Sequence, residues 1–172
     1  MDKPRLLGIR LDPKPRPDLE FIYVCDPMCS WCWGSTPALQ QFEGWNRIPL
    51  RVVMGGLRTG PQAQVMDAEA RQHFATYWQG VAQRAGQAFT TASLERDGWR
   101  YDTEPSCRSV VTMRELFPHD TLRWVARLHR AFYVEGIDVT EPSELTARLE
   151  EHFGDLSELA VGVACDPETG RC

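Results

Sequence analysis

Residues 25–34 read CDPMCSWCWG, and they bring Cys25, Cys29 and Cys32 close together in the chain. The apolar run before them, residues 19–25, is rich in β-forming side chains and predicts a strand. After the Asp-Pro break, residues 29–45 predict a helix. Cys29 and Cys32 therefore form a C-x-x-C sequence between a strand and a helix. Such a tight cluster favours cysteine chemistry over a framework of structural disulfides.

The position of this C-x-x-C sequence suggests a redox pair. Backbone N–H groups at a helix N-terminus stabilise an anion, so a thiolate placed there has a lowered pKa. We predict that Cys29 attacks a disulfide and that Cys32, deeper in the fold, resolves the mixed disulfide. Trp31 and Trp33 flank Cys32, and we predict that they line an apolar surface that binds substrate.

Other interpretations of the cysteines stay open. The pair could be inert core residues or half of a zinc site, although a zinc site needs two more ligands at compact spacing. Cys25, Cys29 and Cys32 also spell C-x-x-x-C-x-x-C, the spacing with which radical-SAM enzymes hold an iron–sulfur cluster. Against that interpretation, the chain turns helical after its second strand, and Cys25 ends a strand as a core residue would. We therefore expect no metal and no cofactor.

The fold prediction extends outward from this motif. Residues 50–54 predict a second strand, which stops at Gly55-Gly56. Strand, helix and strand make a right-handed βαβ unit with parallel pairing. Pro37 lies within the predicted helix and should kink it or delay its start. A sheet of two strands is too small to stand alone, so further strands or a partner are expected.

After Gly60 the apolar residues recur at steps of three and four, which predicts helices rather than strands. Cys107 falls on an apolar helical face and is interpreted as a core residue. The histidines are scattered and are interpreted as surface or packing residues. The predicted helical stretches are residues 70–85, 107–117, 122–132 and 142–153, with residues 98–105 as a loop.

Length, net charge and hydropathy exclude some classes of function. The 172 residues suit one domain with an insertion, and the net charge of −5 argues against nucleic acid as a partner. Residues 1–17 are polar and proline-rich and do not resemble a secretory signal, and no apolar run is long enough to span a bilayer. We expect a cytoplasmic protein with no membrane partner. Cys165 and Cys172 are then expected to be free thiols.

The motif at residues 25–34 resembles the active-site segment of DsbA-like thiol oxidoreductases, in the branch close to FrnE. The resemblance covers about residues 19–155 and includes VMGGL (53–57), EPSCR (104–108) and RAFYVEG (130–136). It implies an α/β fold, with a thioredoxin-like βαβ unit interrupted by a helical insertion domain. It also implies an enzyme that exchanges disulfides with protein or small-molecule thiols through Cys29 and Cys32. A redox-sensing adaptor with the same fold is the alternative function.

One departure from the family concerns the C-terminal half of the thioredoxin sheet. No X-Pro followed by a β-rich run comes after Gly154, whereas the family has a cis-proline strand there. We expect a truncated product that lacks this half of the sheet. The predicted divisions are a lead-in (1–18), a βαβ half with C-x-x-C (19–60), a helical insertion domain (61–155) and an atypical tail (156–172).

Overall fold

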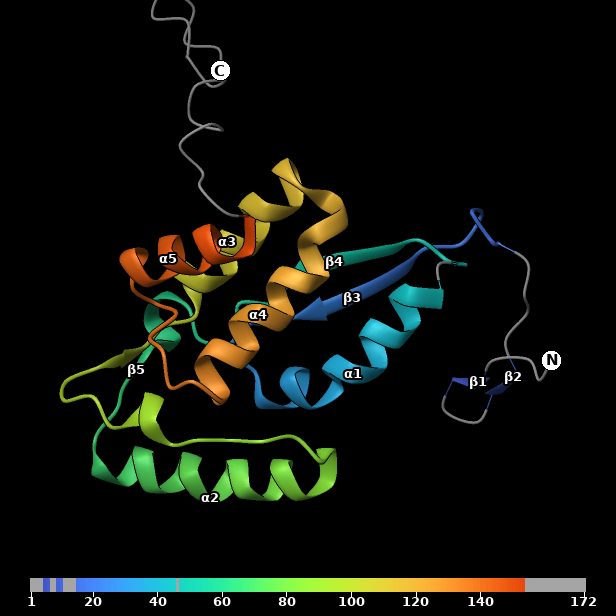
Figure 1. The fold of residues 1–172 in the computed structure, drawn as a ribbon. Coiled ribbons are helices and arrows are strands. Elements are labelled where there is room, and N and C mark those ends of the chain that lie inside the picture. The colour runs from blue at the N-terminus through green and yellow to red at the C-terminus, as the bar shows by residue number, and fades with distance from the viewer. Residues whose placement is uncertain (1–4, 7–8, 11–14, 46, 154–172) are drawn as a thin grey trace, which may run out of the picture.

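A computed structural model gives the fold, and it describes residues 5–6, 9–10, 15–45 and 47–153 (Figure 1). The predictions for Cys165, Cys172 and the tail therefore lie outside the described residues. The strands are β1 (Arg5–Leu6), β2 (Ile9–Arg10), β3 (Phe21–Cys25), β4 (Leu50–Met54), β5 (Gln64–Val65) and β6 (Arg100–Tyr101). The α-helices are α1 (Ser30–Trp45), α2 (Ala68–Ala85), α3 (Glu104–Leu116), α4 (Thr121–Tyr133) and α5 (Pro142–Phe153). Single 3₁₀ turns lie at Gly60–Gln62, Ala92–Leu94 and Pro118–Asp120.

The predicted βαβ unit is confirmed. Strands β3 and β4 pair in parallel, with Phe21 opposite Leu50 and Cys25 opposite Met54. Helix α1 connects them, as Figure 1 shows. It covers one face of the pair, where the Phe21 ring lies 4.7 Å from the Phe42 ring of α1. The motif therefore lies where β3 ends and α1 begins.

Pro37 does not delay the start of α1. The helix already begins at Ser30, and Pro37 lies inside it. A proline there cannot donate to the carbonyl four residues earlier, which belongs to Trp33. The side chain of Gln87 donates to that carbonyl instead, at 3.4 Å. A tertiary contact thus satisfies the acceptor that Pro37 leaves open.

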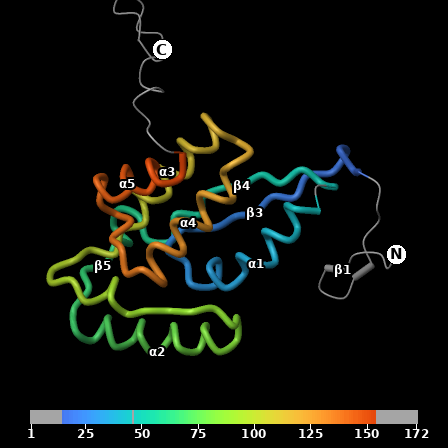
Figure 2. Tube along the Cα trace, viewed as in Figure 1, coloured from blue at the N-terminus to red at the C-terminus, as the bar shows by residue number. Residues whose placement is uncertain are grey.

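The helical part packs against α1 rather than forming a separate layer. Helix α2 is capped at its start by Asp67, which accepts from the N–H of Ala70, and at its end by Gly86 in the left-handed conformation. Helix α4 is the most buried element, and it contacts α1, α3 and α5. In Figure 2, α2 and α3 run on opposite sides of α1 and α4.

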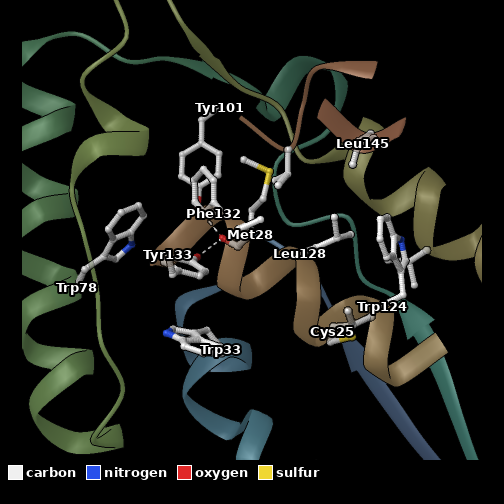
Figure 3. Close-up of a cluster of buried hydrophobic side chains, with 14 of the residues drawn as sticks. Cys25, Met28, Trp33, Trp78, Tyr101, Trp124, Leu128, Phe132, Tyr133 and Leu145 are labelled. Carbon is white, nitrogen blue, oxygen red and sulfur yellow. Dashed lines mark hydrogen bonds between the residues drawn. The ribbon is translucent and has the colours of Figure 1, made fainter. Parts of the chain in front are cut away.

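The core is unusually aromatic near the motif. Trp78 of α2 packs edge-on against Tyr133 of α4 at 4.9 Å, and Trp99 stacks on Tyr101 at 5.3 Å. Trp78, Trp99 and Trp124 are buried and Trp45 is half-buried, so these tryptophans fill the core or its edge. Figure 3 shows part of this core around Met28 of the motif, with Tyr101 and Tyr133 close to it.

The prediction of a loop over residues 98–105 is wrong in part. Arg100–Tyr101 pair with Gln64–Val65 in a short antiparallel ladder, and α3 already begins at Glu104. A two-residue strand is too short to show a periodic pattern. Among the described residues, no helix is long and apolar enough to cross a membrane.

Candidate active site

Cys29 occupies the capping position of α1. Its N–H donates to the carbonyl of Asp26 at 3.0 Å, and its own carbonyl accepts from Trp33 at 3.0 Å. The side chain of a residue in this position can accept from the second and third N–H groups of the helix. Here the Cys29 sulfur accepts from the N–H groups of Trp31 and Cys32. The N–H groups that have no partner within α1 at its start therefore donate to the Cys29 sulfur.

The two thiols of the motif have opposite electrostatic character. The Cys32 thiol donates to the Cys29 sulfur, and with the two backbone donors it lowers the pKa of Cys29 to about 6 against the desolvating effect of burial. The same hydrogen bond raises the pKa of Cys32 well above its ordinary value, and burial adds to the rise. The lowered pKa of Cys29 favours its thiolate form, and the raised pKa of Cys32 favours its thiol form.

Asp26 holds the loop before Cys29. Its carboxylate accepts from the N–H of Met28 at 2.8 Å and from the N–H of Leu57 at 2.7 Å. The Cys107 thiol of α3 donates to the same carboxylate at 3.3 Å. Asp26 is buried, and its charge opposes the lowering of the pKa of Cys29. It therefore joins the motif, the loop after β4 and the helical part through one side chain.

His129 of α4 lies beneath the motif as a neutral ring. Burial lowers its pKa to about 4. Its Nε2 lies 3.2 Å from the Asp26 carbonyl oxygen, so Nε2 carries the proton, and Nδ1 accepts from the Thr36 hydroxyl at 3.1 Å. His129 is a packing residue, as predicted. It also hydrogen-bonds to the loop between β3 and α1 and to α1 itself.

Two tyrosines fix the peptide that precedes Cys29. The hydroxyls of Tyr101 and Tyr133 both donate to the carbonyl oxygen of Met28, as the dashed lines in Figure 3 show. Tyr101 comes from β6 and Tyr133 from α4, and both are completely buried. The helical part of the chain therefore sets the position of Cys29 as well as covering it.

A cavity of about 280 Å³ opens beside Cys29. Trp31 forms part of its rim, is 43% exposed, and donates from Nε1 to the Tyr77 hydroxyl of α2 at 2.7 Å. Arg58 also lines the cavity. The remaining lining is mostly aromatic and apolar and comprises Met28, Ser30, Leu57, His73, Phe74, Tyr77, Trp78 and Tyr101. A largely apolar cavity with few polar groups next to a thiolate can receive a sulfur-bearing ligand.

The structure brings together only some of the predicted site residues. Cys29, Cys32 and Trp31 lie together at the start of α1. Trp33 is only 8% exposed, and its Nε1 donates inward to the Ala88 carbonyl, so the structure does not bring it to the surface beside Cys29. Cys25 is 3% exposed, and burial raises its pKa to about 12.

Cys25 is one of the three cysteines that the iron–sulfur interpretation needs, and it is buried. Within the described ranges, no three or more His, Cys, Asp or Glu side chains are arranged to hold a metal ion. Cys107 is buried as predicted, and burial raises its pKa above the ordinary range.

The sequence did not predict the residues that reach the motif and its cavity from distant parts of the chain. Arg58, Tyr101, His129 and Tyr133 lie far from the motif in the chain, and nothing in local spacing links them to it. The only signal was the aromatic and histidine content of the helical segments. The role of Asp26 in holding the loop also depends on tertiary contacts, which the sequence does not show.

The comparisons with known proteins identify similar structures. No protein-family model matches the chain, and no curated protein gives a match. A provisionally assigned protein disulfide isomerase from Nitrosomonas europaea superposes with a TM-score of 0.68 and 31% identity, over 81% of this chain. The cytosolic disulfide reductase DsbM from Pseudomonas aeruginosa superposes with TM-scores of 0.67 with glutathione and 0.68 in a second structure, both at 26% identity over 84% of this chain.

The chain spans only part of these solved structures, namely 65% of the first and 66% of DsbM. The fold of this chain is therefore a mixed α/β fold of the thioredoxin-like, DsbA type, with helices inserted after the βαβ unit.

Proposed function

We propose that this chain is a thiol–disulfide oxidoreductase of the DsbA family, in the FrnE-like branch, with Cys29 as nucleophile and Cys32 as resolving thiol. The observation that carries the proposal is the pairing of unlike thiols at the start of α1. The pKa of Cys29 is lowered to about 6, and the pKa of Cys32 is raised by donating to it. A thiolate next to a protonated thiol is what two-step disulfide exchange requires.

Disulfide exchange by this pair breaks one sulfur–sulfur bond for each one that it forms. The Cys29 thiolate attacks one sulfur of a partner disulfide, which forms a mixed disulfide and releases the other partner sulfur as a thiolate. The Cys32 sulfur then attacks Cys29 and displaces the second partner sulfur, which takes the Cys32 proton. The two cysteines lose two electrons and the partner disulfide gains them, and the reverse sequence reduces the Cys29–Cys32 disulfide.

The surroundings of the pair support this role. Trp31 and the aromatic wall of the cavity would hold the apolar part of a partner next to Cys29. The names of the similar structures, a disulfide isomerase and a disulfide reductase, point to the same chemistry. Because DsbM is described as cytosolic and with glutathione, we propose a cytoplasmic protein whose partners include small thiols.

The test is turnover of a model disulfide by the whole chain. The unmodified chain should catalyse reduction of bis(2-hydroxyethyl) disulfide by a thiol, and Cys29→Ser should abolish that catalysis. Cys32→Ser should instead accumulate a mixed disulfide on Cys29, visible as an adduct by mass spectrometry.

The matched control is Cys25→Ala. It removes a thiol of the same motif that is buried and has a raised pKa, so exchange should persist. Exchange that survives Cys29→Ser, or that is lost equally in Cys25→Ala and Cys29→Ser variants that both fold, would contradict the proposal.

A further inference from the structure

Arg58 is held firmly at the mouth of the cavity beside Cys29. Its N–H donates to the Thr103 hydroxyl at 3.2 Å, and its carbonyl accepts from the Thr103 N–H at 2.9 Å. Its guanidinium lies over the rings of Phe74 and Tyr101, 4.7 Å from each ring centre. Backbone and side chain are therefore both fixed, and little entropy remains to be lost when the guanidinium binds a ligand.

The guanidinium nevertheless has no hydrogen bond or ion pair within the part of the chain that the structure describes. Asp67 and Glu69 line a neighbouring hollow together with Arg58, but neither forms an ion pair with it. Asp67 already accepts from the N–H of Ala70 as the cap of α2. The aromatic rings stabilise the positive charge but accept none of the five N–H donors in its plane.

We propose that Arg58 binds a carboxylate of the thiol or disulfide whose sulfur reacts with Cys29, and so makes the site selective for carboxylate-bearing partners. This inference rests on the proposed disulfide exchange and names its substrate class. A planar guanidinium with free donors matches a carboxylate in bidentate geometry. Arg58 and Cys29 line the same cavity, so one ligand can reach both.

The size of the cavity favours a small partner. A volume of about 280 Å³ suits a small peptide thiol with a free carboxylate, or one arm of it. The same carboxylate could also come from an acidic side chain of a protein disulfide. We take the low-molecular-weight peptide thiol as the occupant, and the test separates the two sources.

The experiment compares second-order rate constants for oxidation of the reduced full chain, followed by quenching and thiol trapping. The probes are glutathione disulfide, its tetraethyl ester, bis(2-hydroxyethyl) disulfide and a folded acidic protein with one exposed disulfide. Esterification removes the carboxylates from the ligand and needs no change in the protein. The unmodified chain should therefore prefer glutathione disulfide to its ester by about tenfold, the worth of one charge-assisted contact.

The variants test the same contact from the protein side. Arg58→Gln should lower the ratio of the rate constant for glutathione disulfide to that for bis(2-hydroxyethyl) disulfide by about tenfold. Arg58→Lys should keep part of the ratio, because it retains the charge without the fork. Arg100→Gln is the matched control, since Arg100 is exposed, donates to the Gly60 carbonyl and lies outside the cavity. That variant should leave the ratio unchanged.

The outcomes separate a failure of the Arg58 inference from a failure of the proposed function. Equal rates of the unmodified chain with glutathione disulfide and its ester, or an Arg58→Gln variant with an unchanged ratio, would overturn the inference. A preference confined to the acidic protein would overturn the choice of a small thiol. A chain that reacts with none of the disulfides would instead overturn the proposed function, and the inference would fall with it.

Discussion

At the scale of the residue, the central feature is a cysteine at the start of a helix whose pKa is lowered by its surroundings. The N–H groups of Trp31 and Cys32 and the Cys32 thiol all donate to the Cys29 sulfur. These donors are built into the start of α1, so they need no rearrangement when the thiolate forms.

The first prediction concerns the pH dependence of Cys29 alkylation. A depressed pKa means that the thiolate is present at neutral pH and is lost as the pH falls through about 6. In the reduced chain, the rate of carbamidomethylation at Cys29 should therefore rise to a plateau above pH 6 or so. Peptide mass spectrometry against pH measures this, and a midpoint near 9, the ordinary thiol value, would contradict it.

The second prediction concerns Asp26→Asn. The Asp26 charge raises the pKa of Cys29, so its removal should shift the alkylation midpoint of Cys29 to lower pH. The same variant replaces a buried acceptor of three hydrogen bonds and should cost about 1–3 kcal/mol of stability. A midpoint that moves to higher pH would show that Asp26 acts on Cys29 in another way.

Residues whose role is local were predictable, and residues whose role is tertiary were not. The strand before Cys29 and the helix after it define the environment of the pair within one short stretch of sequence. Trp33 has the same local context as Trp31, but its side of α1 meets the helical part, where Ala88 accepts its N–H. Arg58 is held beside the cavity by two hydrogen bonds with Thr103, a residue whose distance along the chain gives no sign of this contact.

At the scale of the element, α1 carries two glycines in opposite environments. A Cβ at Gly34 would lie 2.8 Å from the Cβ of Ala85 in α2, whereas a Cβ at Gly44 would meet nothing within 4 Å. Gly34 therefore lets α1 and α2 approach closely. Gly44 contributes only backbone freedom, which weakens a helix.

The third prediction uses these glycines as a matched pair. Gly34→Ala should destabilise the fold by about 1–3 kcal/mol, because overpacking forces α1 and α2 apart. Gly44→Ala in the same helix should stabilise it by up to about 1 kcal/mol through helix propensity. Urea unfolding measures both free energies, and effects of the same sign would show that the α1–α2 contact does not limit the fold.

The elements themselves were mostly predictable. The strands at residues 21–25 and 50–54 and the helical stretches were evident from side-chain type and periodicity. The pair β5–β6 was missed because two residues in each strand are too few to show a periodic pattern. The predicted delay of α1 by Pro37 was wrong, and Gln87, far along the chain, donates to the carbonyl that Pro37 leaves without a helical donor.

At the scale of the molecule, the helical part holds the motif in place. Tyr101, Tyr133, His129 and Cys107 all reach the loop between β3 and α1. The division of the chain into a βαβ half and a helical insertion domain stays a prediction, but these contacts mean that the position of the motif depends on both parts.

The fourth prediction concerns the sheet face opposite α1. Ile22 and Val24 of β3 point to this face and are 49% and 61% exposed. Neighbouring apolar side chains on such a face bind apolar dyes or partners. The paired variant Ile22→Thr with Val24→Thr keeps β-branched residues, so it should reduce binding of anilinonaphthalene sulfonate while changing stability by less than about 1 kcal/mol. Unchanged dye binding would show that this face is covered in solution.

The most direct test of the account is an equilibrium titration of the full chain in glutathione redox buffers, with acid quenching, thiol trapping and mass spectrometry to locate each bond. The proposed disulfide exchange predicts one dithiol–disulfide transition within the range of the buffers, with the bond joining Cys29 to Cys32 and with Cys25 and Cys107 reduced throughout. A chain in which Cys29 and Cys32 never pair, or in which a different pair forms first, would contradict it.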